Sequence, residues 1–375
     1  MDSHTREHMP RFLDEYVRAL RFSLSWTDGE VVDFEAWRET ARARVLDCLL
    51  YDPPECDFAP EVLGEEDCGS YVQRRISFAP SPWYRVPAYL LVPKGDGPFP
   101  AMVVCHDHGA FFYWGKEKVV ATGADAHPAL AEFKRCSYGG RSIANELAER
   151  GYAVIAIDAL HWGERAVRGV GESELDLATA DGVLAFNRLA VEAQAMMGIN
   201  LLNAGICWSG VIVRDDLRTA QFLASLPEVD ETRIGSCGLS VGCWRSWHLA
   251  ALSELIRASA NICWMTRIQP QLLGRMNFAR STSAMSMTIP GLRGLMDFPD
   301  VASLIAPRPA LFFNGLQDGL FPIASVEDAY ARMALAWDAA GASERLCTRL
   351  WDVPHTFDER MQADAFAWLD GWLLA

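Results

Sequence analysis

One serine of this sequence stands in a pattern that suits a nucleophile. Ser240 is the centre of Gly238-Leu-Ser-Val-Gly242, which fits G-x-S-x-G. In that pattern the serine sits on a tight strand-to-helix turn, and the glycines allow close backbone packing. The pentapeptide also occurs in unrelated chains, but here an apolar, β-prone run precedes it and a helix-like run, 244–255, follows. We predict that Ser240 is a nucleophile; the alternative is a glycine-rich turn of an ordinary α/β protein.

A serine hydroxyl needs a base, and the base needs an orienting carboxylate. For this kind of turn the chain order is serine, acid, histidine. His355 is the only histidine after His248 and is therefore the predicted base, and Asp318, which follows a predicted strand, is the predicted acid. Asp352 and Asp358 are fallback acids, but they lie awkwardly close to His355 in sequence. The non-catalytic alternatives are that Asp318 only forms a turn and that His355 is a polar helix cap.

Acyl transfer also needs N–H groups that stabilise a developing oxyanion. The N–H of Val241, at the start of the predicted helix, is the expected first donor. The second is expected from the loop after the predicted strand 101–105, which begins with His106-Asp-His-Gly-Ala110. Because Gly109 permits a backbone turn, we predict that Ala110 supplies this N–H.

Aromatic residues crowd the segments that follow two predicted strands. His108, Phe111 and Trp114 come after one of them, and Trp162 lies in His161-Trp-Gly-Glu-Arg165 after another. We predict that these four side chains contact the substrate. The alternatives are that half of the aromatic side chains pack beneath their loop, and that 161–165 forms ion pairs that order its own loop.

The sequence predicts neither a metal ion nor disulfides. His106-Asp-His108 offers possible zinc ligands, but no second cluster accompanies it and no H-E-x-x-H motif is present. The ten cysteines include no C-x-x-C pair, and Cys105, Cys237 and Cys263 lie in or beside apolar runs. We expect most cysteines to be reduced core residues.

The predicted elements place the candidate residues at one edge of a sheet. Buried or alternating apolar runs predict eight strands, at 71–78, 84–92, 101–105, 153–157, 234–238, 258–262, 310–314 and 346–351. Helices are predicted at 142–150, 214–225 and 357–374, with two more within 9–52. This alternation indicates an α/β fold, a mostly parallel sheet with helices on both faces, which binds ligands beyond the carboxyl ends of its strands.

Two regions are expected along the chain: an N-terminal helical extension, 1–69, and a catalytic domain, 70–375. Three connections, about 106–140, 159–212 and 264–305, are too long for simple turns. They leave the carboxyl ends of predicted strands, so we expect them to wall the pocket.

Composition restricts the class of partner. The 375 residues are half hydrophobic and carry a formal charge of -15, which argues against nucleic acids and anionic membranes. No apolar run reaches the roughly 20 residues that span a bilayer. The start, MDSHTREHMPRF, lacks the apolar core of a secretory signal, so a cytoplasmic location is expected. A homo-oligomer remains open.

Further motifs extend over residues 70–375. They are His106-Asp-His-Gly-Ala110, Gly115-Lys-Glu-Lys118, Asp215-Asp-Leu-Arg218, Pro227-Glu-Val-Asp-Glu-Thr-Arg-Ile234, Gly238-Leu-Ser-Val-Gly242, Cys263-Trp-Met-Thr266, Pro299-Asp-Val-Ala-Ser-Leu-Ile-Ala-Pro-Arg-Pro309 and Gly315-Leu-Gln-Asp318. Together they resemble the dienelactone-hydrolase-like and acetyl-xylan-esterase-like bacterial branch of the α/β-hydrolase superfamily. The resemblance implies the α/β-hydrolase fold and a cofactor-free esterase with Ser240, Asp318 and His355 as nucleophile, acid and base.

The chain departs from that branch in three ways. Dienelactone hydrolases proper use a cysteine nucleophile where Ser240 stands, many secreted esterases of the branch begin with a signal peptide, and the turn reads Ser-Val-Gly-Cys rather than Ser-x-Gly-Gly. The expected activity is hydrolysis of a small-molecule carboxylic ester, with a small acyl or acetyl group on a sugar or aryl alcohol. The alternatives are a C–C bond hydrolase or peptidase with the same triad, and a non-catalytic binding protein.

Overall fold

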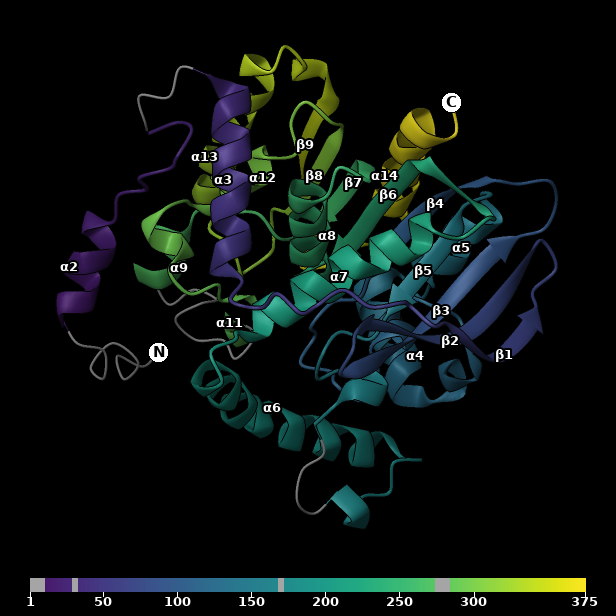
Figure 1. The fold of residues 1–375 in the computed structure, drawn as a ribbon. Coiled ribbons are helices and arrows are strands. Elements are labelled where there is room, and N and C mark those ends of the chain that lie inside the picture. Colours follow the sequence, from purple (N-terminus) through teal and green to yellow (C-terminus); the bar gives the residue numbers. More distant parts are fainter. Residues whose placement is uncertain (1–10, 29–32, 168–171, 274–283) are drawn as a thin grey trace.

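The computed structural model describes residues 11–28, 33–167, 172–273 and 284–375, and these contain one nine-stranded sheet (Figure 1). The strand order is β1-β2-β3-β5-β4-β6-β7-β8-β9. From β5 through β4 to β9 the strands are parallel, whereas β1, β2 and β3 pair antiparallel, and β3 is antiparallel to β5. The bounds are β1 Glu61–Asp67, β2 Tyr71–Ser81, β3 Tyr84–Pro93, β4 Phe99–Cys105, β5 Ala153–Ile157, β6 Val229–Leu239, β7 Ile256–Ile262, β8 Ala310–Gly315 and β9 Leu346–Trp351. The predicted mostly parallel sheet is confirmed.

Helices cover both faces of this sheet (Figure 1). Their bounds are α2 Arg11–Ala19, α3 Phe34–Cys48, α4 Pro128–Tyr138, α5 Ile143–Glu149, α6 Ala180–Asn203, α7 Trp208–Ala224, α8 Val241–Leu252, α9 Ile268–Leu273, α11 Ala284–Met287, α12 Phe298–Ser303, α13 Ile323–Ala339 and α14 Glu359–Leu373. Side chains of α3, α7, α8, α12 and α13 share one apolar cluster with the sheet, and those of α5 and α14 share another. Along β4, Ala101 and Val103 join the first cluster and Met102 and Val104 the second, because alternate side chains of a strand face opposite ways.

The structure differs from the sequence-based expectation in two places. The sheet has nine strands rather than eight, because β1 pairs with β2 inside the region expected to be a helical extension. Every residue of β1 is exposed, so its sequence carries no alternating apolar signal. The long connections also contain helices: 106–140 holds α4, 159–212 holds the 24-residue α6, and 264–305 holds α9, α11 and α12. Residues 1–10, 29–32, 168–171 and 274–283, which fall within these expected regions, lie outside the described residues.

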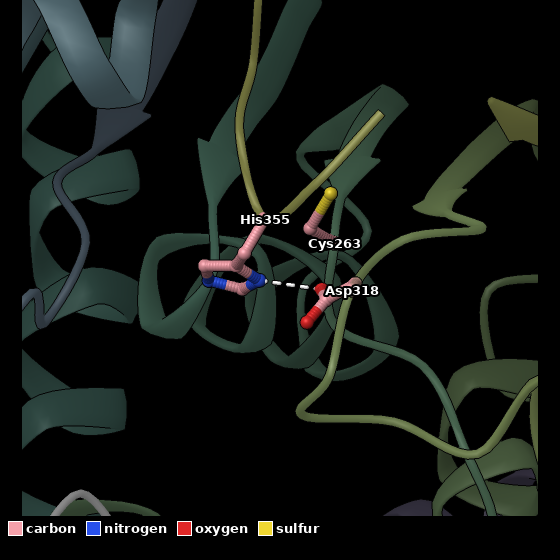
Figure 2. A group of neighbouring side chains, drawn as sticks. All are labelled: Cys263, Asp318 and His355. Atoms are coloured by element: carbon pink, nitrogen blue, oxygen red, sulfur yellow. Dashed lines mark hydrogen bonds and ion pairs between the residues drawn. The ribbon is translucent and has the colours of Figure 1, made fainter. Parts of the chain in front are cut away.

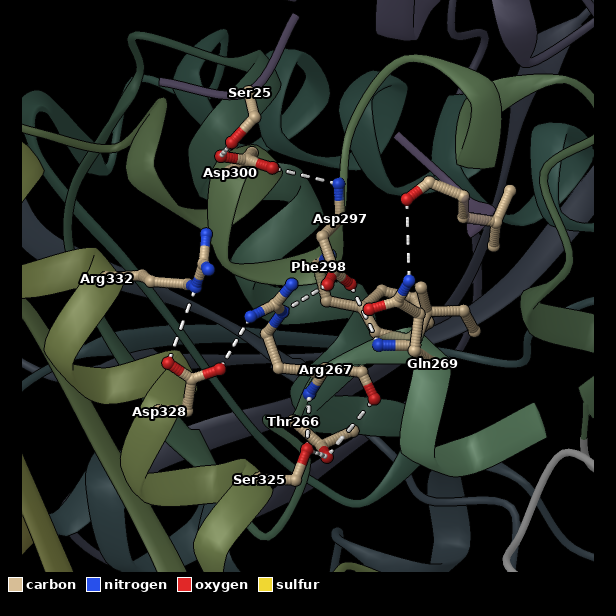
Figure 3. Close-up of polar contacts among 12 residues, drawn as sticks. Ser25, Thr266, Arg267, Gln269, Asp297, Phe298, Asp300, Ser325, Asp328 and Arg332 are labelled. Carbon is tan, nitrogen blue, oxygen red and sulfur yellow. Dashed lines mark hydrogen bonds and ion pairs between the residues drawn. The ribbon is translucent and has the colours of Figure 1, made fainter. Parts of the chain in front are cut away.

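The N-terminal segment 20–28 is fastened to the connection that follows β7 (Figure 3). Ser25 Oγ donates to Asp300 Oδ1 at 2.7 Å, and the N–H of Trp26 donates to the same oxygen at 3.2 Å. The N–H of Leu24 donates to the carbonyl of Leu295 at 2.8 Å. These contacts join the start of the chain to the 264–305 connection, which leaves the carboxyl edge of the sheet.

The Asp300 contact predicts a dependence of stability on pH. Burial raises the pKa of Asp300 to about 6, so the folded protein binds this proton more tightly than the unfolded chain. The resulting stabilisation is present below the unfolded pKa and is lost as pH rises through about 6. We expect the unfolding free energy of Asp300→Asn, relative to the parent, to rise between pH 4.5 and 7.5 by at most about 3 kcal/mol.

Urea unfolding at several pH values measures this difference. Asp47→Asn is the matched control, because it makes the same change on an exposed side chain paired with Arg44. Parallel stability curves for the parent and Asp300→Asn across this range would show that the Asp300 proton does not contribute.

In the described part of the chain, no single helix is long and apolar enough to cross a membrane. One bent pair, α6 with α7, passes that test of length and composition jointly, with an angle of 83° between the two helices.

Candidate active site

Ser240 lies on a strained turn between β6 and α8. Its backbone has φ 60° and ψ −122°, an unfavourable conformation for a residue with a Cβ. The two glycines of the motif explain how the turn closes. A Cβ on Gly242 would lie 2.1 Å from the carbonyl oxygen of Cys105, and one on Gly238 would lie 2.4 Å from the backbone of Gly242. The motif therefore has the strand–turn–helix context and the close packing that its sequence predicted.

This packing predicts the effect of one added methyl group. Gly242→Ala places a Cβ against the backbone of β4, so α8 or the strand must shift. We expect a loss of about 1–3 kcal/mol in unfolding free energy, together with lower turnover. Gly371→Ala is the matched control, because nothing lies within 4 Å of its added Cβ, in α14. Equal melting temperatures for the two variants would contradict the close approach.

His355 and Asp318 form a hydrogen-bonded pair at the same edge of the sheet (Figure 2). His355 Nδ1 lies 2.6 Å from Asp318 Oδ2. The Asp318 side chain is fully buried, and its Oδ1 accepts the N–H of Leu320 at 2.9 Å, whereas the His355 side chain is 27% exposed. With the carboxylate as acceptor, Nδ1 carries the ring proton and Nε2, which faces away from Asp318, is left to accept another.

The order of the strands brings Ser240 to the same edge. Ser240 follows β6, Asp318 follows β8 and His355 follows β9, and these strands are parallel. The N–H of Ser240 donates to the carbonyl of Ile262 at 2.9 Å, at the end of β7. The next residue, Cys263, has its Sγ within 4.8 Å of ligand atoms of both Asp318 and His355. Ser240 thus lies beside the segment on which the His–Asp pair packs.

Cys263 belongs to this cluster, although its sequence context predicted only a core residue. It has φ 57° and is fully buried. With Asp318 and His355 it offers a possible metal-ligand set, in which the ligand would be the thiolate. Here the thiol donates to the carbonyl of Thr356 at 3.4 Å, and burial, with the nearby Asp318 charge, raises its pKa. We therefore interpret the cluster as a His–Asp pair packed on a protonated thiol.

The two predicted oxyanion donors have different surroundings. Val241 is the first residue of α8, directly after Ser240, where the sequence placed it. The N–H of Ala110, by contrast, donates to His108 Nδ1 at 2.9 Å. This assignment needs correction, because in this conformation the N–H of Ala110 is engaged and is not available to an oxyanion.

The predicted substrate residues are largely buried. Trp162 has no exposed surface and stacks on Phe112 with ring centroids 5.1 Å apart, so its assignment as a substrate contact is wrong. His108 is buried beside Trp162, and burial lowers its pKa to about 3, so it is neutral and orders its own loop.

Phe111 and Trp114 are also buried, as the alternative interpretation held. The ring of Phe111 stacks on Phe133 at 4.7 Å, and Trp114 lies against His127 at 5.0 Å. Both residues lie in the loop after β4, as predicted. An apolar residue in a loop can either line a pocket or pack inside the protein, and the sequence does not distinguish these two cases. Neither residue presents a large exposed face to a substrate in this structure.

Ion pairs hold together the loops that follow β4 and β5. The sequence analysis did not predict that Lys116 takes part in them. Its Nζ, fully buried, lies 2.7 Å from Asp158 and 2.8 Å from both Glu117 and Glu164. Arg165 pairs with the buried Asp215 at 2.8 Å. Segment 161–165 therefore orders its loop through ion pairs, the alternative given for it above.

The ten cysteines, all within the described ranges, are unpaired. Five are buried, one is exposed and the other four are half-buried, so burial is less general than the sequence predicted.

Comparison with known proteins gives one relative by sequence and several by structure. No family model matches the chain. A protein of Bacillus subtilis (strain 168), named "Putative hydrolase YtaP", is 29% identical over 265 residues, which are 69% of this chain and 74% of that protein.

Several solved structures align over most of the chain. A Bacteroides fragilis NCTC 9343 protein described as "a putative acetyl xylan esterase" has a TM-score of 0.66 at 18% identity, covering 91% of this chain and 81% of that one. A glucuronoyl esterase from Solibacter usitatus has a TM-score of 0.61 at 11% identity, covering 94% and 97%. An acetyl xylan esterase from Paenibacillus sp. R4 has a TM-score of 0.56 at 14% identity, covering 97% and 100%. These similarities and the strand order confirm the predicted α/β-hydrolase fold.

Proposed function

We propose that this chain is a serine hydrolase that cleaves a carboxylic ester through an acyl-enzyme. The observation that carries the proposal is the 2.6 Å contact between His355 and Asp318, at the sheet edge where Ser240 lies on its strained turn. The acid is buried and oriented, the base is partly open, and the proposed nucleophile is half-buried. This division suits nucleophilic catalysis at an accessible edge.

The mechanism follows from this geometry. His355 Nε2 takes the proton of Ser240 as Oγ bonds to the carbonyl carbon, and the carbonyl oxygen becomes an oxyanion held by backbone N–H groups. The oxyanion then collapses, the C–O bond to the alcohol breaks, and the imidazolium returns its proton to the leaving oxygen. Water attacks the acyl-enzyme in the same way, and releases the acid and free Ser240. Asp318 stabilises the imidazolium both when the acyl-enzyme forms and when water cleaves it.

We further propose a small acyl or acetyl ester of a sugar or an aryl alcohol as substrate. The support is the naming of the structural neighbours as acetyl xylan and glucuronoyl esterases, and the mechanism asks for no cofactor. The surplus of acidic residues supports an uncharged or cationic substrate over nucleic acid.

A substrate panel tests the bond that is cleaved. It contains p-nitrophenyl acetate, acetylated xylose, a methyl glucuronate, a lactone, a β-diketone and a chromogenic peptide. We expect turnover of one or more esters and none of the diketone or the peptide. Turnover of the diketone or the peptide alone would contradict the ester proposal and favour the C–C hydrolase or peptidase alternative.

A further inference from the structure

A second buried lysine, Lys118, binds the backbone of the loop that follows β4. Its side chain has no exposed surface. Nζ donates to the carbonyl oxygens of Asp107 and His108, each at 3.0 Å, and lies 3.7 Å from the Asp107 carboxylate. That carboxylate is itself buried and accepts the hydroxyl of Tyr138 at 2.7 Å. A buried ammonium is costly unless it is paired, so these contacts hold both the lysine and the loop in place.

Because the peptide unit is planar, fixing the carbonyl groups of this loop also fixes the direction of its N–H groups. The peptide bonds here are trans, so a carbonyl and the following N–H point in opposite directions. With the carbonyl of His108 turned toward Lys118, the N–H of Gly109 is turned away from it. The N–H of Ala110 and that of Phe111 are already used, by the ring and the carbonyl of His108.

Gly109 is therefore a free donor on an accessible residue. Across the described ranges its N–H has no hydrogen-bond partner, and the residue is exposed. It has φ 58°, and a Cβ there would lie 2.5 Å from the ring of Phe133, so a glycine is needed for the loop to close in this shape.

The gripped loop begins beside the turn that carries Ser240. The first turn of α8 packs on the end of β4, where a Cβ on Gly242 would meet the carbonyl oxygens of Cys105 and His106 at 2.1 and 2.9 Å. The next peptides of the loop are those that Lys118 orients. The 106–110 loop thus starts against the first turn of α8, the same turn that begins with Val241.

We propose that Lys118 is a positioning residue for the oxyanion hole, which it sets by holding the Asp107 and His108 carbonyls so that the N–H of Gly109 serves as the second donor beside Val241. This inference rests on the proposed ester hydrolysis and replaces the assignment of Ala110. Lys118 acts through the backbone and does not itself touch the substrate.

The titration of Lys118 supports this role. Burial lowers the pKa of Lys118 to about 8, against the attraction of the carboxylates of Asp107, Asp158 and Glu117. The ammonium that is drawn to Asp107 and to both carbonyls is therefore present at neutral pH and lost as pH rises through about 8. Turnover should fall over the same range.

Lys118→Met tests the proposal, because methionine fills a similar volume without an N–H donor. We expect kcat for p-nitrophenyl acetate to fall about 100- to 1,000-fold, as for loss of one oxyanion donor, while KM changes no more than a few-fold. Lys134→Met is the matched control. Lys134 is also a buried lysine of the 106–140 connection, but it binds the carbonyl of Val120, the carboxylate of Asp125 and the hydroxyl of Ser142, away from the 106–110 loop.

The outcomes separate this inference from the proposed function. If the parent protein hydrolyses no ester, the proposed function fails first. If the parent is active and Lys118→Met keeps its kcat, or Lys134→Met loses as much, the positioning role is overturned. Should Lys118→Met not fold, the kcat of the parent decides: a fall through about pH 8 supports the role, and a constant kcat from pH 7 to 9.5 overturns it.

Discussion

Replacing Ser240 with alanine is expected to lower kcat for p-nitrophenyl acetate about a million-fold. The hydroxyl supplies the bond to the acyl group, and no other group in the mechanism replaces it. Ser240 is half-buried on a turn whose backbone is fixed by Gly238 and Gly242, so loss of one oxygen leaves the packing intact. Steady-state hydrolysis and a thermal melt measure both properties.

Ser225→Ala is the control for this variant. Ser225 directly follows α7 at the opposite edge of the sheet, where its hydroxyl donates to the carbonyl of Phe222. We expect full turnover from Ser225→Ala and an unchanged melting temperature from Ser240→Ala. Residual hydrolysis by Ser240→Ala within tenfold of the parent would remove Ser240 from the mechanism.

Asp318→Asn is expected to lower kcat about ten-thousand-fold. An amide at this position donates to His355 Nδ1 where the carboxylate accepts, which forces the ring proton onto Nε2, the nitrogen that must receive the proton of Ser240. The hydrogen bond of 2.6 Å and the full burial of the Asp318 side chain leave little room for another orientation.

Asp352→Asn makes the same chemical change three residues before His355. Its carboxylate accepts from Gln317 at an exposed site and has no bond to the imidazole. We expect near-parental kcat from Asp352→Asn across the pH range of the assay. The reverse order of effects would make Asp352, the fallback acid of the sequence analysis, the partner of His355.

The strands could be predicted where burial shapes the sequence. Each of the eight predicted strands has its counterpart, from β2 to β9. In β2 to β8 the buried residues form apolar or alternating runs, and in β9 the residues of the apolar signal are half-buried. β1 was missed because all of it is exposed. α6 was missed because its own apolar residues lie on its exposed side as well as its buried side, so they do not mark one face.

The candidate site could be predicted only as far as the order of residues along the chain determines it. The G-x-S-x-G motif predicted Ser240, and the expected order of serine, acid and histidine with few histidines to choose from predicted Asp318 and His355. The parallel strands bring these three segments to one edge of the sheet. The roles of Trp162 and Ala110 depended on side-chain direction and on hydrogen bonds, which the sequence pattern does not contain. Lys118 was missed as a positioning residue because a charged residue in a loop indicates solvent exposure unless its buried partners are known.

Intact-mass analysis after treatment with a fluorophosphonate tests the central claim most directly, because the reagent forms a covalent adduct only with a nucleophile activated by a base. The account predicts one phosphonyl group per chain, carried by the peptide that contains Ser240, and no adduct on Ser240→Ala. An unlabelled parent protein, or a label on any other residue, would contradict the claim that Ser240, His355 and Asp318 act together.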